Sequence, residues 1–260
     1  MNYQTLHIEL QNRVLYVSLN RPEKHNAFND IMLNELTDCF KKAGKEEILC
    51  IVLKGNGQSF SAGADLQWMK DVAQNTYEQN YQDSLLLSKC FLSIYTCPRP
   101  AIAIVHGAAL GGANGLITAC DLAYCADDAV FSLSEIKIGM IPACISPYII
   151  KRIGEHSARE LMLTGRRITG AEAEKIRLVN RSVPKDRLND TLNDTIKLLR
   201  TSGPEAMSQC KQLIHQVTNV LSFDEAYHYT AKMIAGIRAS EEVQEGLAAF
   251  LEKRKPKWIE

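Results

Sequence analysis

The stretch Gly107-Ala-Ala-Leu-Gly-Gly-Ala-Asn-Gly115 decides how the fold of this chain is interpreted. It follows the apolar run 101–105, which predicts a buried strand. Four glycines in nine residues at the end of such a strand indicate that another group approaches the backbone closely. The stretch alone leaves three candidates open for that group: a phosphate, a carbonyl oxygen or a neighbouring helix.

The composition excludes some classes of protein. Thirty basic side chains balance thirty acidic ones, which argues against nucleic-acid binding driven by bulk charge. The start MNYQTLHIEL lacks the pattern of a secretory signal, and no apolar run is long enough to predict a membrane span. The eight cysteines lack metal-site spacing, so we expect them reduced and buried in a cytoplasmic protein without a bound metal.

Hydrophobic periodicity predicts an α/β protein whose last third is helical. The expected strands are 14–19, 48–53, 101–105, 122–125 and 130–133. One helix is expected to begin near Asn29. Further helices are expected over 65–95, with a polar interruption at 74–82, and over 116–120. We divide the chain into a core over residues 1–195 and a C-terminal helical region over 196–260.

Two glycine-containing segments follow apolar strands in the same way: Ser59–Leu66 and the opening stretch. Each predicts main-chain N–H groups at the start of a helix, where they have no intrahelical partner. Two such ends that converge would bind a developing oxyanion, whereas the alternative is glycines that serve only packing. Neither segment has the spacing of a phosphate loop, and no Gly-x-Ser-x-Gly predicts a serine nucleophile.

Glu135 is the candidate for proton transfer. It stands between apolar neighbours in the segment Phe131–Pro142. A carboxyl group in apolar surroundings has a raised pKa and can act as a general acid or base near neutral pH. The alternative is a surface glutamate paired with Lys137.

Five motifs in order resemble the signatures of the enoyl-CoA hydratase/isomerase, or crotonase, superfamily. They are Arg21–Phe28, Phe60–Leu66, His106–Gly112, Ala119–Leu122 and Ser134–Pro142. The resemblance covers nearly the whole chain. It implies a spiral of ββα units with a C-terminal helical region that forms homotrimers, commonly paired into hexamers. It also implies an acyl-CoA thioester as substrate, so that coenzyme A is part of the substrate and no separate cofactor is expected.

The same resemblance assigns expected roles to individual residues. The N–H groups of Ala64 and Gly112 would form an oxyanion hole for the thioester carbonyl, with Glu135 as the catalytic carboxylate. The residues expected to contact CoA or substrate are Lys24, Ala27, Ala62, Asp65, Leu66, Phe250 and Lys253, of which the last two often reach a neighbouring subunit. The residues expected to line the acyl pocket, with core packing as the alternative, are Trp68, Met69, Asn114, Gly115, Met140 and Cys144.

The chain departs from the two-carboxylate hydratases at Gly115, where they carry their first glutamate. Hydration needs a proton at C2 and an activated water at C3, and two carboxylates usually share this work. Three hypotheses remain. Glu135 shuttles a proton between C2 and C4 as a Δ3,Δ2-enoyl-CoA isomerase, or it hydrates with a water held by Asn114 and the main chain. In the third, the substrate brings its own carboxylate.

The segment Leu133–Tyr148, together with Gly115-Leu116, favours the third hypothesis because it resembles hydratases of branched glutaconyl-CoA thioesters in leucine or terpene breakdown. We therefore predict a reversible hydratase of the 3-methylglutaconyl-CoA type, with the isomerase as the alternative. A Clp-type serine hydrolase would need a serine where Ala113 and Asn114 stand. An RNA-binding module would need an aromatic and basic platform, which the sequence lacks.

Overall fold

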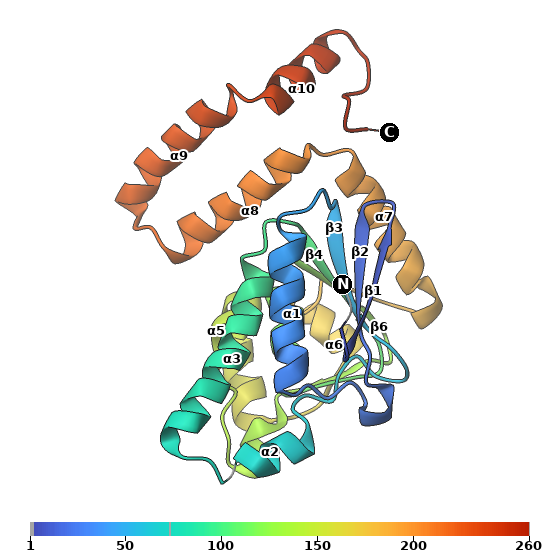
Figure 1. Ribbon diagram of the computed structural model, residues 1–260, viewed down its shortest axis with the longest axis vertical. Helices are drawn as coiled ribbons and strands as arrows, with labels where there is room; N and C mark the ends of the chain where they lie inside the picture. Colours follow the sequence, from blue (N-terminus) through green and yellow to red (C-terminus); the bar gives the residue numbers. More distant parts are fainter. Residues whose placement is uncertain (1–2, 73, 260) are drawn as a thin grey trace.

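The computed structural model describes residues 3–72 and 74–259 and contains a main sheet of six strands (Figure 1). The strand order is β1-β2-β3-β4-β6-β9; β1 and β2 form an antiparallel hairpin, and the other neighbours are parallel. The strands span Leu6–Gln11 (β1), Val14–Leu19 (β2), Cys50–Gly55 (β3), Ala101–Val105 (β4), Leu122–Ala126 (β6) and Arg181–Val183 (β9).

A smaller sheet carries the glycine stretch. Its order is β5-β7-β8, with strands Ala108–Leu110 (β5), Val130–Ser132 (β7) and Ile168–Thr169 (β8). β5 and β7 are parallel, and Leu110 pairs with Ser132. The ends of these two strands therefore lie side by side. The chain that leaves β5 leads to Gly112, and the chain that leaves β7 leads to Glu135. The glycine stretch thus contains a short strand that its sequence did not predict.

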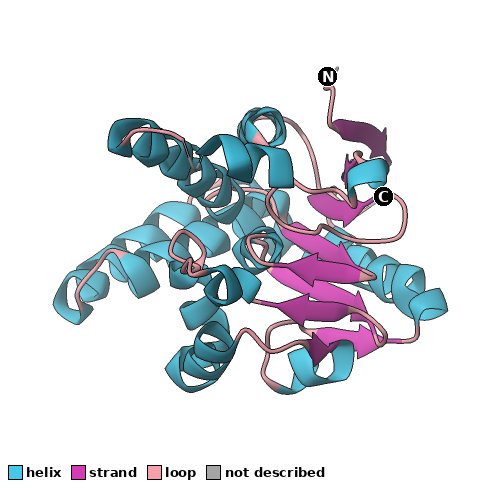
Figure 2. Cartoon of the chain, turned by 90° about the horizontal axis from the view of Figure 1, so that it is seen from below, coloured by secondary structure: helices cyan, strands magenta, loops and turns pink. Residues whose placement is uncertain are grey.

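Most of the helices gather on one side of the strands (Figure 2). Those of the core are Asp30–Ala43 (α1), Leu66–Val72 (α2), Tyr77–Tyr95 (α3), Ala113–Ala119 (α4), Ser146–Thr164 (α5), Gly170–Lys175 (α6) and Leu188–Arg200 (α7). Three short 3-10 helices are Pro22–Lys24 (η1), Ser134–Ile138 (η2) and Lys185–Arg187 (η3).

Side-chain caps set where two predicted helices begin. Asn29 accepts a hydrogen bond from the N–H of Met32 and starts α1, as expected. Thr76 and Gln79 form a capping box that starts α3 at Tyr77, so the polar interruption is shorter than the predicted 74–82. Ala73, which falls inside the predicted helical range, is outside the described residues.

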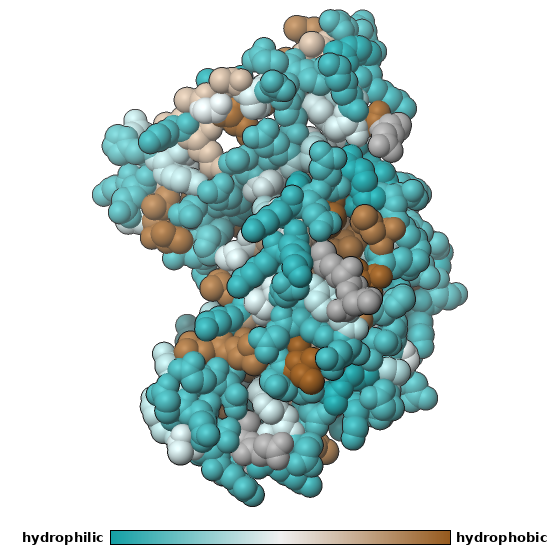
Figure 3. All heavy atoms as spheres, viewed as in Figure 1, coloured by the Kyte–Doolittle hydropathy of each residue, from teal (hydrophilic) through white to brown (hydrophobic). Residues whose placement is uncertain are grey.

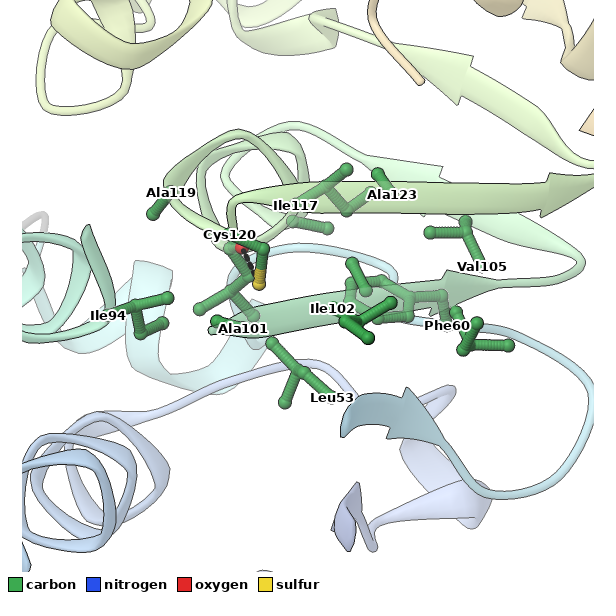
Figure 4. Close-up of a cluster of buried hydrophobic side chains, with 14 of the residues drawn as sticks. Leu53, Phe60, Ile94, Ala101, Ile102, Val105, Ile117, Ala119, Cys120 and Ala123 are labelled. Atoms are coloured by element: carbon green, nitrogen blue, oxygen red, sulfur yellow. Dashed lines mark hydrogen bonds between the residues drawn. The ribbon is translucent and has the colours of Figure 1, made fainter. Parts of the chain in front are cut away.

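The core lies between the parallel strands and the helices that cover them. All five residues of β4 are buried, as a strand covered on both faces requires. Figure 4 shows Ile102 of β4 beside Leu53 of β3 and Ala123 of β6, all of them fully buried. Six of the eight cysteines are buried free thiols: Cys39, Cys50, Cys90, Cys97, Cys120 and Cys125. Cys144 is half-buried and Cys210 is exposed, unlike the expectation that all are buried.

The C-terminal helices extend away from this core (Figure 1). They are Pro204–Asn219 (α8), Phe223–Ile237 (α9) and Glu241–Leu251 (α10). The expected boundary at residues 195 and 196 falls inside α7, and Ile196 is buried in the core. The extended region begins instead at Pro204. Within residues 3–72 and 74–259, every helix is too short or too polar to span a lipid bilayer.

Apolar side chains lie exposed along the three C-terminal helices, and Figure 3 shows hydrophobic patches there in brown. The exposed set is Ile214, Val217, Val220, Phe223, Tyr227, Ile234, Leu247, Phe250 and Leu251. No residue of α8 is buried. A single copy of the chain therefore leaves much of this helical surface without an apolar cover.

Candidate active site

The two glycine segments meet backbone against backbone. Gly63 has a φ of +88°, and a Cβ atom on it would stand 2.6 Å from the carbonyl oxygen of Leu110. The same Cβ position lies 3.8 Å from the nitrogen of Gly112. Only glycine permits this close approach and this φ value. The chain next to Gly63 is thereby brought beside the start of α4.

Two main-chain donors at this meeting point have no partner in the described residues: the N–H groups of Ala64 and Gly112. Hydrogen bonds between Phe28 and the two residues that flank Ala64 turn the N–H of Ala64 to the other side of its strand. Gly112 is the N-cap of α4, where an N–H has no intrahelical acceptor. Both donors are free to bind the oxygen of a ligand.

The carboxyl group of Glu135 lies next to this turn. A Cβ atom on Gly111 would stand 3.4 Å from Oε1 of Glu135. Oε2 is buried and has no hydrogen-bond partner in the described residues. Burial raises the pKa of Glu135 above its ordinary value. Within the same described ranges, no ion pair joins Glu135 to Lys137, so the surface pairing considered above is absent.

Apolar side chains occupy the space that a side chain at Gly115 would need. Its Cβ would stand 2.4 Å from Cγ2 of Ile145 and 2.6 Å from Cζ of Phe91. All three residues are buried. The position where two-carboxylate hydratases carry a glutamate is therefore closed by packing.

The other predicted pocket residues differ in their contacts and in their burial. Trp68 lies edge-on to Phe28, whose ring covers Gly112, so it belongs to the surroundings of the donor turn. Met69 on the same helix is half-buried. Met140 is 49% exposed, and Cys144 is half-buried with its thiol 3.7 Å from the carbonyl oxygen of Ser84.

The side-chain amide of Asn114 donates only to main-chain carbonyl oxygens. Its Nδ2 is therefore not free to hold a water molecule for hydration, as one hypothesis required.

One of the residues predicted near CoA, Asp65, belongs to a partly buried ion pair that sequence reasoning missed. Arg21 donates to Oδ2 of Asp65 at 2.7 Å and to the carbonyl oxygen of Ala27 at 2.6 Å. Burial raises the pKa of Asp65, but the N–H of Gln67 and the Arg21 guanidinium outweigh this and lower it. The only sequence feature that pointed to this ion pair was the position of Arg21 at the start of the first motif.

Asp65 therefore caps the start of α2. The remaining positions differ in exposure. Lys24 and Leu66 are exposed, Ala27 is buried, and Ala62 is half-buried.

Phe250 and Lys253 lie far from this site within one chain. Phe250 is on α10 and Lys253 follows it, at the end of the molecule opposite to α2 (Figure 1). Both side chains are exposed. The described residues contain no group of three or more His, Cys, Asp or Glu side chains that could hold a metal ion.

The fold and the site define a class of protein in which two unpaired main-chain N–H groups lie beside one half-buried carboxyl group. Residues 9–260 match the family described as enoyl-CoA hydratase/isomerase. The solved structure of an enoyl-CoA hydratase from Shewanella pealeana is 38% identical with a TM-score of 0.94, over 98% of this chain and 96% of that one. AtuE from Pseudomonas aeruginosa is 32% identical with a TM-score of 0.96, over 99% and 100%.

A curated relative carries the isomerase name. The mitochondrial Delta(3,5)-Delta(2,4)-dienoyl-CoA isomerase of Rattus norvegicus is 32% identical over 272 residues, covering 99% of this chain and 83% of that protein. The chain belongs to the enoyl-CoA hydratase/isomerase family. The crotonase-like α/β fold and the enzyme class predicted from the sequence are therefore confirmed.

Proposed function

We propose that this enzyme reversibly hydrates a branched glutaconyl-CoA thioester of the 3-methylglutaconyl-CoA type. The observation that carries the proposal is a site with one carboxyl group, Glu135, beside two unpaired main-chain donors. The substrate brings the second carboxylate itself. The closed packing at Gly115 supports this division of work, because the protein has no room for a carboxylate there.

The first step is polarisation of the thioester. The carbonyl oxygen accepts hydrogen bonds from the N–H groups of Ala64 and Gly112, and negative charge gathers on it as water adds at C3. Each such donor typically contributes about 2.7–4 kcal/mol to the stability of the transition state. Because both donors belong to the backbone, they are already in place when the charge develops.

Glu135 in its protonated form then supplies the proton that C2 gains. Its raised pKa increases the fraction of the enzyme in which Glu135 is protonated. The distal carboxylate of the substrate accepts the proton that the attacking water loses. After the step Glu135 is ionised and the substrate carboxyl is protonated, and exchange with solvent restores both. In the reverse direction Glu135 removes the C2 proton, and the hydroxyl group at C3 leaves as water after it takes a proton from the distal carboxyl group of the substrate.

The second candidate is a Δ3,Δ2-enoyl-CoA isomerase. Ionised Glu135 would take a proton from C2 and return it to C4, with the same two donors stabilising the dienolate oxygen. The apolar contacts of Ile145 and Phe91 favour this candidate, because they leave no second protein carboxylate to activate water.

The proposal extends to the assembly. The exposed apolar side chains of α8, α9 and α10 support a homotrimer or hexamer, in which Phe250 and Lys253 contact the CoA of a neighbouring subunit. The enzyme would act in the cytoplasm, with no cofactor besides the CoA of its substrate and no nucleic-acid partner.

A substrate panel tests the proposal. Purified protein receives 3-methylglutaconyl-CoA, crotonyl-CoA and a 3-enoyl-CoA, and water addition and double-bond migration are followed separately. We expect hydration to be fastest with the glutaconyl thioester and to be lost in Glu135→Gln but not in the exposed control Glu155→Gln. Migration without hydration would overturn the hydratase in favour of the isomerase.

The pH dependence separates the two candidates again. Hydration needs protonated Glu135, so kcat should fall as the pH rises through the pKa of this group in the complex. Isomerisation needs ionised Glu135, so kcat should rise over the same range.

A further inference from the structure

Asn114 is buried behind the glycine turn as the second residue of α4, with 1% of its surface exposed. Its Nδ2 donates to three main-chain carbonyl oxygens: Ala109 at 3.2 Å, Gly111 at 3.0 Å and Ser132 at 3.0 Å. All three neighbours are acceptors, so only the nitrogen of the amide fits there, and the orientation of the side chain is fixed.

These carbonyl groups belong to the two segments that carry the chemistry. Ala109 and Gly111 lie in β5 and in the turn that leads to the free N–H of Gly112. Ser132 ends β7, three residues before Glu135. The N–H of Gly111 also donates to the carbonyl oxygen of Ser132, at 2.8 Å. One buried amide therefore ties the oxyanion turn to the segment that holds the carboxyl group.

We propose that Asn114 is a positioning residue that fixes the N–H of Gly112 relative to the carboxyl group of Glu135. The inference rests on the proposed function, which gives these two groups their roles. Without the amide, three buried carbonyl groups lose a donor, and the turn can shift against β7. A shift of about 1 Å at reacting groups typically costs about 100-fold in rate.

The test replaces Asn114 by leucine, which has a similar size and no donor. We expect kcat to fall about 100-fold while KM changes by less than about three-fold, because CoA contacts lie elsewhere. Thr118→Val is the matched control. Thr118 is also buried in α4 and donates to the carbonyl oxygen of Asn114 at 2.7 Å, but it does not contact the turn. This control should keep its kcat.

A second readout does not depend on turnover. Butyryl-CoA labelled with ¹³C at the thioester carbonyl cannot be hydrated, and its infrared stretching frequency falls when hydrogen bonds polarise the carbonyl. We expect a lowered frequency in the wild type and in Thr118→Val, and a return toward the free value in Asn114→Leu. If Asn114→Leu does not fold, Asn114→Ser keeps one donor and should give an intermediate frequency and an intermediate kcat.

The possible outcomes distinguish failure of the proposed function from failure of the positioning role of Asn114. A wild-type enzyme that leaves the frequency unchanged has no oxyanion hole, which overturns the proposed function and this inference with it. A lowered frequency in the wild type that persists in folded Asn114→Leu or Asn114→Ser, with kcat unchanged, overturns the positioning role alone. An equal loss of kcat in Thr118→Val also overturns it, because the effect would then reflect general packing of α4.

Discussion

The carboxyl group of Glu135 lies against the backbone of Gly111, so that a Cβ atom there would stand 3.4 Å from Oε1. Gly111 has a φ of +53° and directly precedes Gly112, whose N–H is unpaired. The carboxyl group that we propose transfers a proton and the N–H that we propose binds the oxyanion are thus separated by one residue without a side chain. A side chain at Gly111 would therefore affect the position of both groups.

Gly111→Ala should lower kcat by about 10-fold or more, because its methyl group would touch the carboxyl group of Glu135 and the turn would shift to relieve the strain at its positive φ. The positive φ adds strain of about 1–3 kcal/mol. Gly154→Ala is the control, since Gly154 has a φ of +74° and nothing within 4 Å of its Cβ position. Both variants should lose stability in thermal unfolding, but only Gly111→Ala should lose kcat. Equal kcat values in the two variants would contradict the contact.

Glu135→Gln should abolish turnover and yet raise the melting temperature at neutral pH. Burial raises the pKa of Glu135 in the folded protein, so the unfolded chain releases this proton at lower pH. The stability that Glu135 contributes is full below its unfolded pKa and is lost as the pH rises through its folded pKa.

Glutamine removes this loss, so the gain in melting temperature should vanish near pH 4, where both states are protonated. The exposed control Glu155→Gln should change the melting temperature little at either pH. A lower melting temperature for Glu135→Gln at pH 7 would contradict the raised pKa of Glu135 in the folded protein.

Gly115→Ala should destabilise the protein by about 1–3 kcal/mol, because its Cβ would overlap with Ile145 and Phe91. Gly236→Ala is the opposite case. Gly236 lies in α9 with nothing within 4 Å of its Cβ position, so alanine should stabilise by about 0.5–1 kcal/mol. Urea unfolding measures both changes. A neutral Gly115→Ala would show that the surrounding side chains repack freely.

Asp65→Asn should cost about 1–3 kcal/mol at pH 7, because it leaves the half-buried guanidinium of Arg21 without its charged acceptor. The folded state lowers the pKa of Asp65. Its stabilisation is therefore present above the unfolded pKa and is lost as the pH falls through the folded pKa.

The difference between wild type and Asp65→Asn in urea unfolding should accordingly shrink as the pH falls below about 4. A difference that stays constant from pH 7 to pH 2 would exclude the ion pair as its cause. The exposed pair of Glu155 and Arg159 offers the comparison, since Glu155→Gln should cost less than about 0.5 kcal/mol.

The sequence was sufficient wherever the signal is local. The alternating, β-branched pattern of β2 and the continuous apolar run of β4 predicted both strands with their observed ends. Asn29 predicted the start of α1 because a cap acts within three residues. The strand β5 escaped prediction, since three residues between glycines carry no usable periodicity. The predicted break in the helix at 74–82 was too long. The prediction followed the polar residues and did not use the capping box at Thr76, which starts the next helix.

The site shows the same division. The sequence could indicate Glu135 and the two glycine turns as candidates, because their residue types and neighbours are typical of proton transfer and of main-chain donors; the structure brings them together. The partner of Arg21 lies 44 residues away, and the side chains that close Gly115 come from α3 and from the start of α5. Asn114 was assigned to the acyl pocket, although its amide bonds the main chain on both sides of the turn. Such contacts depend on the packing of distant segments, which periodicity does not report.

The closed packing around Gly115 also limits how this enzyme can evolve. A second catalytic carboxylate there would first need smaller side chains at both Phe91 and Ile145. Each of those changes alone opens a cavity, which typically costs about 2–5 kcal/mol for a large buried side chain. Every single-step ancestor or descendant on that route would be less stable without yet gaining the new chemistry. The reaction type is therefore inherited together with the core, as one unit.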